Sequence, residues 1–412
     1  LSLTDFYYSL AERENLMKVK NIVIAQDRFS LLGGITTVNR ILGRAFKEAG
    51  YNVSYLALYD NTGDNPDAVT PDFVIRAGSL VSKTTHNKLV YNNPGPLGAV
   101  LAAKKAFTVL WDRYNAVRTR RYLQSLGKDT VVLTSMTDIA EYLVDYARQG
   151  RKQGIGYLYE FHSAFDSFHR TTREKTLKDI GRYYDSFIAL SEGDARLFAE
   201  WLNRPVDAVF NPNVYITPEI QQKIMGIAQQ KKPVIQYIGR YGAEKGLMRI
   251  LESFIACAPE FPEWTLKLNG SGNDETERQM HELLETLEPA LAERIVVGGP
   301  LSSEQVLEAY AEASLTICAS DFEGGPMSLQ EGMRVGTPLV SYPSSYLLLD
   351  YLPEFGYLAE ERSVEALTKQ LRLAIGDDEL RAKKSALCVE KSSIFSPEYI
   401  VQCWEKVFGS IH

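Results

Sequence analysis

Glu323-Gly-Gly-Pro-Met-Ser-Leu-Gln-Glu331 decides the fold prediction, because it joins two carboxylates across a glycine turn. The apolar run from Ala313 to Ala319 predicts a buried strand before it, and a Gly-Thr-Pro turn at 336–338 leads into a short strand after it. In this order Glu323 ends a strand, and Glu331 lies about two turns into the next helix. The first amides of that helix can bind an anion. The stretch therefore suits a ligand with hydroxyls and phosphate, although a glycine turn before a surface helix would give the same pattern.

A second motif lies upstream, where two cations follow a predicted strand. Val234 to Ile238 form that strand, and Gly239-Arg-Tyr-Gly-Ala-Glu-Lys-Gly246 leads into an amphipathic helix from Leu247 to Cys257. Arg240 and Lys245 then stand at the edge of an α/β sheet where ligands bind. An arginine offers a planar fork and a lysine a point charge, and together they can neutralise a diphosphate. A capped loop with solvated charges is the alternative.

Strand and helix signals alternate along the whole chain, which predicts an α/β protein with doubly wound parallel sheets. The first half predicts strands at Lys20–Gln26, Val53–Leu58, Thr130–Ser135, Gly154–Glu160 and Ser186–Leu190, and helices at Ile35–Ala49, Thr137–Arg148 and Gly193–Leu202. The second half adds strands at Trp264–Asn269, Arg294–Val297, Ser314–Ala319 and Pro338–Ser341, and a last helix at Ser396–Phe408.

The alternation of strands and helices is interrupted once, at Phe210-Asn-Pro-Asn213. A polar stretch through 229–232 then leads into a second series of strands and helices. A chain of 412 residues also exceeds the size of one ordinary core. We therefore predict one Rossmann-like domain at 1–211 and a second at 212–395.

Together the two motifs resemble those of the retaining GT-B glycosyltransferases of the family 4 type. The resemblance implies two Rossmann-like domains that face each other across a cleft, an acceptor-side domain first and a nucleotide-sugar-binding domain second. It also implies that the C-terminal helix, 396–412, returns to the first domain. Some teichoic-acid and capsule transferases share the same spacings, the histidine discussed below and a glycine loop such as Gly33-Gly34.

The resemblance also assigns roles, with the pyrophosphate at Arg240 and Lys245, the sugar at Glu323 and the ribose at Glu331. The donor-binding residues that it implies are Gly33, Gly34, Arg240, Lys245, Glu323, Met327, Ser328, Leu329 and Glu331, and the catalytic ones are His162, Arg240, Lys245 and Glu323. His162 follows the strand at 154–160, where family members carry a histidine that contacts the transferred sugar. A polar loop residue or a satisfied core histidine is the alternative for His162, and its position after a strand favours the functional role.

The implied reaction moves a hexose or N-acetylhexosamine from a UDP-sugar to an acceptor hydroxyl, with retained anomeric configuration. The acceptor would be a cell-surface glycan, a teichoic-acid-like polymer or a lipid-linked molecule. The chain contains no Asp-x-Asp pair, on which metal-using GT-A transferases rely, so we expect no metal and no cofactor. Two alternatives stay open, a UDP-sugar epimerase with the GT-B fold and a non-catalytic carbohydrate-binding relative.

Composition narrows the class of protein. A net charge of −7 argues against general nucleic-acid binding. The four cysteines form no Cys-x-x-Cys pair, which indicates reduced core residues. No apolar run approaches a membrane span, and the acids in Leu1–Asn15 argue against a signal peptide. These features predict a cytoplasmic protein.

One local segment departs from this acidic background. Residues 104–121 carry six Lys or Arg residues against the single acid Asp112, with aromatic residues interleaved. A basic amphipathic helix of this kind can lie on an anionic membrane or bind a phosphate-rich polymer. A solvated helix face that packs through its aromatic side chains is the alternative. The segment predicts a peripheral contact at the inner membrane face or with an anionic polymer.

Overall fold

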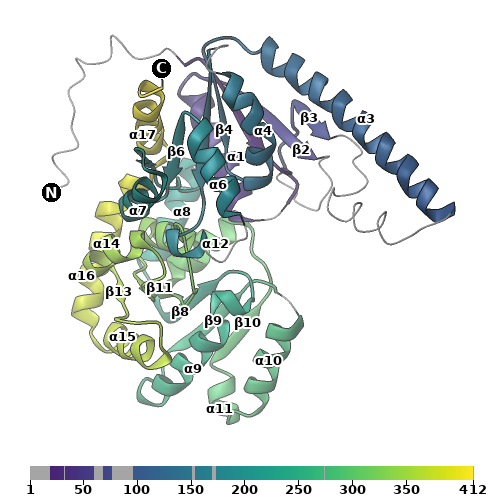
Figure 1. Ribbon diagram of the computed structural model, residues 1–412. Coiled ribbons are helices and arrows are strands. Elements are labelled where there is room, and N and C mark those ends of the chain that lie inside the picture. Colours follow the sequence, from purple (N-terminus) through teal and green to yellow (C-terminus); the bar gives the residue numbers. More distant parts are fainter. Residues whose placement is uncertain are drawn as a thin grey trace, which may run out of the picture. The chain divides into compact units, whose positions relative to one another are not determined.

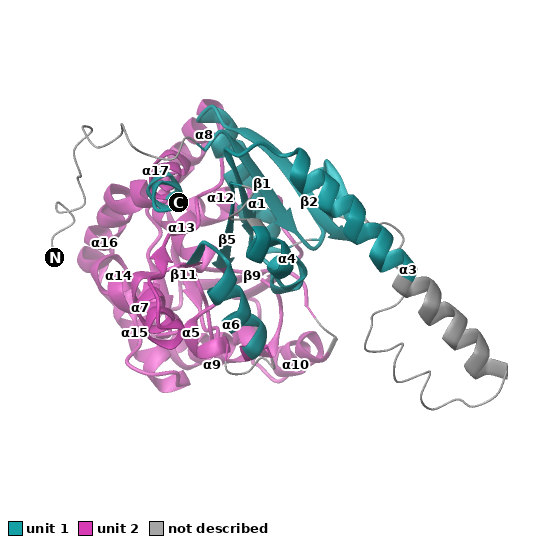
Figure 2. Cartoon of the chain, turned by 45° about the horizontal axis from the view of Figure 1, so that its top comes forward, with its two compact units in different colours: residues 1–160, 175–187, 404–412 teal, residues 161–174, 188–403 magenta. Residues whose placement is uncertain are grey.

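The computed structural model describes residues 19–31, 33–59, 68–76, 96–150, 154–168, 173–272 and 274–411, and the side chains of the helix that begins at Pro96 from Leu110 onward. The chain forms two compact units (Figure 2). Unit 1 comprises Leu1–Glu160, Lys175–Phe187 and Trp404–His412, and unit 2 comprises Phe161–Glu174 and Ile188–Cys403. The domain boundary at 211/212 stays a prediction. Among the described residues, no helix has the length and apolar character that a bilayer crossing requires.

A seven-stranded sheet occupies the first half of the chain (Figure 1). Its strands are β1 (Asn21–Gln26), β2 (Asn52–Tyr59), β3 (Phe73–Arg76), β4 (Thr130–Thr134), β5 (Ile155–Phe161), β6 (Ser186–Ala189) and β7 (Asp207–Ala208). Their order is β3-β2-β1-β4-β5-β6-β7. β4 and β5 are buried along their whole length, as parallel strands covered on both faces are. The helices are α1 (Gly34–Glu48), α3 (Pro96–Ser125), α4 (Thr137–Gly150), α5 (Phe165–Phe168), α6 (Glu174–Tyr183) and α7 (Glu192–Leu202).

A six-stranded parallel sheet forms the centre of the second half. Its order is β10-β9-β8-β11-β12-β13, with β8 (Lys232–Ile238), β9 (Thr265–Asn269), β10 (Ile295–Gly298), β11 (Ala313–Cys318), β12 (Leu339–Ser341) and β13 (Tyr357–Leu358). The helices are α8 (Pro218–Ala228), α9 (Leu247–Cys257), α10 (Asp274–Glu285), α11 (Pro289–Ala292), α12 (Ser303–Glu312), α13 (Met327–Arg334), α14 (Tyr346–Phe355), α15 (Val364–Gly376), α16 (Asp378–Lys391) and α17 (Pro397–Gly409). Since β8 and β11 are neighbours, the loops that follow them lie at one edge of this sheet.

The C-terminal helix α17 packs on the first helix of the chain. The rings of Trp404 and Phe408 lie 6.3 and 5.8 Å from the ring of Phe46 in α1. The Tyr51 hydroxyl donates to the Glu405 carboxylate at 3.1 Å. The expected return of the C-terminal helix is thereby confirmed.

The parallel α/β architecture predicted from the sequence is confirmed, and every strand and helix predicted from it is present within a few residues. The elements that sequence reasoning did not name include β3, β7 and β13, which have only four, two and two residues. Strands so short carry too few positions for an apolar pattern to show. The basic segment 104–121 belongs to the 30-residue helix α3, and the side chains of Lys104 and Lys105 lie outside the described ones.

Candidate functional site

The loop after β8 presents Lys245 beside the end of β11. A short 3-10 turn, Ala243–Lys245, is followed by Gly246. This glycine has a φ of +69° and is the N-cap of α9. A Cβ on Gly246 would stand 2.1 Å from the carbonyl oxygen of Ala319, so only glycine permits this approach. The amide of Asp321 donates to the carbonyl of Glu244 at 2.8 Å. The two motifs of the sequence are therefore joined through their backbones.

Arg249 fixes the same loop from helix α9. It donates to the carbonyl of Ala319 at 2.8 Å and forms an ion pair with Asp321 at 2.8 Å. One step further along, the amide of Glu323 donates to the carbonyl of Ser344 at 2.8 Å. These contacts hold the backbone on both sides of the turn, so the position of Glu323 is determined before any ligand binds.

Lys245 and Glu323 form the central contact of the site. The Lys245 Nζ lies 2.6 Å from the Glu323 Oε1, and the two side chains are 27% and 16% exposed. Burial alone would lower the pKa of Lys245, but the Glu323 carboxylate outweighs it and raises that pKa above its ordinary value. The lysine therefore stays charged at neutral pH, and a phosphate group could replace the carboxylate as its partner.

Arg240 lies in a different environment from Lys245. Its side chain is 74% exposed and pairs with Glu244 at 2.9 Å. Its carbonyl accepts from the Tyr237 hydroxyl at 2.7 Å, which anchors the backbone while the guanidinium faces solvent. The structure thus holds one of the two expected cations in place and leaves the other at the surface.

Helix α13 begins directly after the glycine turn, with Pro326 at its N-cap. Met327 and Ser328 are the first two residues of the helix. The first backbone amides of an α-helix have no carbonyl acceptor within the helix. The amide of Leu329 instead donates to the Pro326 carbonyl at 3.1 Å, and the Leu329 side chain belongs to the core. The first two amides of the helix are therefore the better placed to bind an anion.

Glu331 lies deeper than its expected role suggests. It is 9% exposed, and burial raises the pKa of its carboxyl to about 8. The group is therefore mainly protonated at pH 7. A neutral carboxyl can still bind a diol, because it donates one hydrogen bond and accepts another.

Sequence reasoning missed Gln330, which is fully buried and has no hydrogen-bond partner for either side-chain amide atom. A buried amide normally finds partners, so this side chain is an unusual feature of the α13 core. The sequence carries a signal for it, since Gln330 and Glu331 are two adjacent polar residues that directly follow the core residue Leu329.

His162 follows β5 and lies beside the glycine turn. A Cβ on Gly324 would stand 3.0 Å from the carbonyl carbon and oxygen of His162. The backbone of His162 therefore approaches the residue next to Glu323, and a side chain at position 324 would require one of the two segments to shift. The structure brings His162, Lys245 and Glu323 together within unit 2.

Gly33 and Gly34 belong to unit 1, where Gly33 precedes helix α1. Both are exposed, and a Cβ on either would meet no atom within 4 Å. The space around them does not by itself require glycine. Their expected role at a donor molecule stays a prediction.

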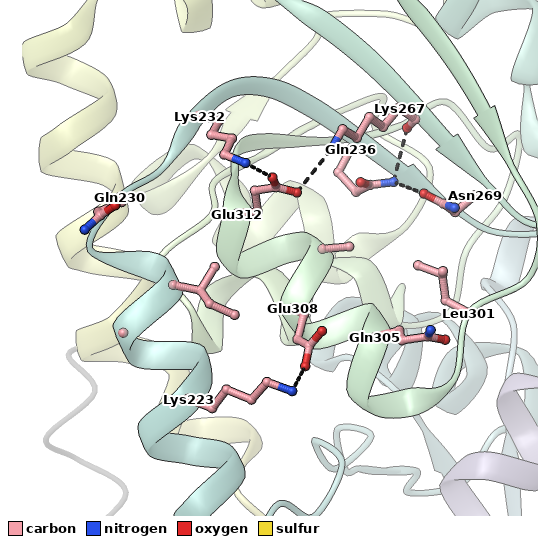
Figure 3. A pocket seen from close by; sticks show the side chains of 13 residues that line it. Lys223, Gln230, Lys232, Gln236, Lys267, Asn269, Leu301, Gln305, Glu308 and Glu312 are labelled. Atoms are coloured by element: carbon pink, nitrogen blue, oxygen red, sulfur yellow. Dashed lines mark hydrogen bonds and ion pairs between the residues drawn. The ribbon is translucent and has the colours of Figure 1, made fainter.

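A polar groove of about 710 Å³ lies elsewhere in unit 2, between helices α8 and α12 and the β8–β9 face of the sheet (Figure 3). Its lysines face carboxylates: Lys223 pairs with Glu308, and Lys232 and Lys267 both pair with Glu312. Gln236 donates to Asn269 at 3.0 Å. None of the sequence-predicted site residues lines this groove, and its cations are already neutralised.

Comparison with known proteins gives one family. Residues 220–386 match the model of glycosyl transferases group 1. An uncharacterized glycosyltransferase of Haemophilus influenzae is 24% identical over 391 residues, which make up 91% of this chain and 96% of that protein. The poly(glycerol-phosphate) alpha-glucosyltransferase of Bacillus subtilis is 25% identical over 198 residues, 47% of this chain and 28% of its own length.

A solved structure shows the same fold. A crystal structure of a S. aureus TarM variant in complex with Fondaparinux, alpha-GlcNAc-glycerol and UDP has a TM-score of 0.69 and 12% identity, and the match covers 94% of this chain and 99% of that chain. The family model spans the loops that bring Lys245 to Glu323. Residues 220–386 therefore match the glycosyl transferases group 1, the GT-B glycosyltransferases of the family 4 type, and the chain is a glycosyltransferase that transfers a sugar from a nucleotide sugar.

Proposed function

We propose that this chain is a retaining glycosyltransferase that moves a hexose or N-acetylhexosamine from a UDP-sugar to a hydroxyl group, without a metal ion. The observation that carries the proposal is the contact of 2.6 Å between Lys245 and Glu323 next to the start of α13. A cation, a carboxylate and the amides of a helix start lie together at this contact. The cation and the amides suit a diphosphate, and the carboxylate suits the hydroxyls of a sugar.

In the proposed reaction, the bond between the anomeric carbon and the diphosphate oxygen breaks while the acceptor oxygen bonds to that carbon on the same face. The departing phosphate takes the acceptor proton. Lys245, Arg240 and the amides of Met327 and Ser328 stabilise the negative charge as it develops. Glu323 accepts hydrogen bonds from the sugar hydroxyls once the phosphate has replaced it at Lys245, and Glu331 binds the ribose diol.

We further propose an acceptor with polyol phosphate or cell-surface glycan chemistry. The name of the Bacillus subtilis relative specifies a poly(glycerol-phosphate) acceptor, and the TarM crystal structure holds alpha-GlcNAc-glycerol together with UDP. Both descriptions concern those proteins, and they support a hydroxyl on a glycerol-type acceptor as the first one to test here.

The proposal is tested by a panel of UDP-glucose, UDP-N-acetylglucosamine, UDP-galactose and GDP-mannose, each with and without poly(glycerol phosphate). Release of UDP that requires acceptor is expected from one of the UDP-sugars. Conversion of a UDP-sugar without acceptor would instead indicate an epimerase. Binding of a donor with no turnover, either with or without poly(glycerol phosphate), would indicate a carbohydrate-binding relative. The Glu323→Ala variant is the matched inactive control.

Chelation of metal ions should leave the activity largely intact. Lys245 and Arg240 supply positive charge where a GT-A enzyme uses a divalent cation. The measurement is the initial rate of UDP release before and after excess EDTA, with a metal-dependent GT-A transferase as control. An absolute requirement for added Mg²⁺ or Mn²⁺ would contradict the proposed donor site.

Alanine variants of the two carboxylates should differ in their affinity for free UDP. Glu331→Ala removes the proposed ribose contact, so it should weaken UDP binding and raise the donor KM with a smaller effect on kcat. Glu323→Ala removes a sugar contact, so it should lower kcat with UDP affinity retained. Isothermal calorimetry on both variants checks this. Loss of UDP affinity in Glu323→Ala alone would mean that the two roles are exchanged.

A further inference from the structure

One face of helix α3 exposes a stripe of large apolar side chains. Leu110, Tyr114 and Val117 are 64%, 54% and 50% exposed. Residues spaced by three and four positions lie on one side of a helix, so the three form a continuous stripe. Figure 1 shows α3 as the long blue helix. Single exposed apolar residues are ordinary, but a stripe of them on one helix face points to a partner.

Arginines flank this stripe on the same face. Arg113, Arg120 and Arg121 are exposed, and their helical positions fall beside those of Val117 and Leu110. The one acid in the described part of α3, Asp112, lies on the opposite side of the helix. The outer face of α3 from Leu110 to Gln124 is therefore cationic and apolar, in a chain whose net charge is −7.

The inner face of the same helix is packed, which fixes the orientation of the outer one. Asn115, Thr119 and Leu123 are buried. The Tyr122 ring stacks on Phe73 of β3 with centroids 4.4 Å apart. The Arg118 guanidinium lies over the ring of Phe73 at 5.1 Å and over the ring of Tyr114 at 5.7 Å, so this arginine links the packed side to the edge of the stripe. The stripe is thus presented by a helix that is held in place by its other side.

We propose that the outer face of α3 docks on an anionic lipid bilayer. A bilayer surface accepts both parts of the face, since arginines pair with lipid phosphates while apolar side chains enter the boundary between headgroups and acyl chains. A soluble polyanion would use the arginines and leave Leu110, Tyr114 and Val117 in water. The charge complementarity of three arginines, together with the apolar stripe next to them, therefore favours the lipid surface.

The test is co-sedimentation of the full chain with vesicles of phosphatidylcholine alone or mixed with phosphatidylglycerol. Binding is expected only to the anionic vesicles and should weaken with salt. The triple variant Arg113→Gln, Arg120→Gln and Arg121→Gln should reduce the partition coefficient on the order of 100-fold. The matched control, Arg278→Gln, Lys369→Gln and Lys383→Gln, removes the same charge from exposed positions of unit 2 and should bind like the unchanged protein.

A second variant, Leu110→Gln, Tyr114→Gln and Val117→Gln, keeps the helix propensity and removes the stripe. It should also lose vesicle binding while its circular dichroism spectrum is unchanged. The proposal is overturned if the unchanged protein ignores anionic vesicles or if the arginine variant binds like its control. Full vesicle binding by the apolar variant would show that the stripe does not enter the bilayer, and it would also overturn the proposal. If the unchanged protein is a dimer in sedimentation velocity and the apolar variant is a monomer, the partner of the stripe is a second copy of the chain.

Discussion

Lys245→Ala is expected to lower kcat by about 10²–10³, the effect of removing one preorganised group that stabilises developing charge. The same change leaves the Glu323 carboxylate, which is 16% exposed, without its partner at 2.6 Å. We therefore also expect a loss of about 1–2 kcal/mol in the free energy of unfolding, after allowance for the remaining solvent. Steady-state kinetics and urea unfolding measure the two effects.

The double variant Lys245→Ala with Glu323→Ala separates catalysis from stability. It should recover much of the stability, because no unpaired carboxylate remains, and it should recover no activity. Arg240→Ala should lower kcat to a similar degree with little change in stability, since its pair with Glu244 is largely exposed. Lys383→Ala, at an exposed position of α16, is the neutral control. Normal kcat in both Lys245→Ala and Arg240→Ala would exclude these cations from the site.

Glu331→Gln is expected to stabilise the protein at alkaline pH. Burial raises the pKa of Glu331 from 4.5 to about 8, so between these values the folded chain holds a proton that the unfolded chain releases. The stability contributed by this group is therefore full below pH 4.5 and is lost as the pH rises to 8. Glutamine mimics the protonated carboxyl and does not titrate, so the variant keeps this stability as the pH rises. The loss that it avoids is on the order of 3–5 kcal/mol in the free energy of unfolding.

Urea unfolding of both proteins at pH 5, 6.5 and 8 measures this difference. The two curves should be close together at pH 5, and Glu331→Gln should be the more stable protein at pH 8. A difference in stability that does not change with pH would show that Glu331 is ionised in the folded chain at neutral pH. Comparing the variants at each pH removes the contribution of every other titrating group that they share.

The backbone of the site could be predicted from sequence because its geometry follows from strand order. β8 and β11 are apolar runs, and neighbouring parallel strands deliver their following loops to one edge. The proximity of Lys245 and Glu323, 78 positions apart, follows from that rule. The glycine that starts α9 and the turn at Gly324 carry the same information in the sequence, since both mark close backbone approaches.

The directions and depths of the side chains could not be predicted in the same way. Arg240 faces solvent and pairs with Glu244, and Glu331 and Gln330 are enclosed by the packing of α13 in unit 2. These properties depend on contacts between elements that are distant in the chain, which local patterns do not encode. The outer face of α3 is a case between these two. Its positive charge was evident from the sequence, whereas the exposure of its apolar side chains was not.

A crystal structure with bound UDP tests the central claim most directly. We predict the diphosphate at Lys245 and the first amides of α13, the ribose at Glu331, and a Lys245–Glu323 distance longer than the 2.6 Å found here because phosphate replaces the carboxylate. The loops at 319–323 and 240–246 should keep their backbone contacts. UDP seated in the polar groove between α8 and α12, with the Lys245–Glu323 pair unchanged, would contradict the account.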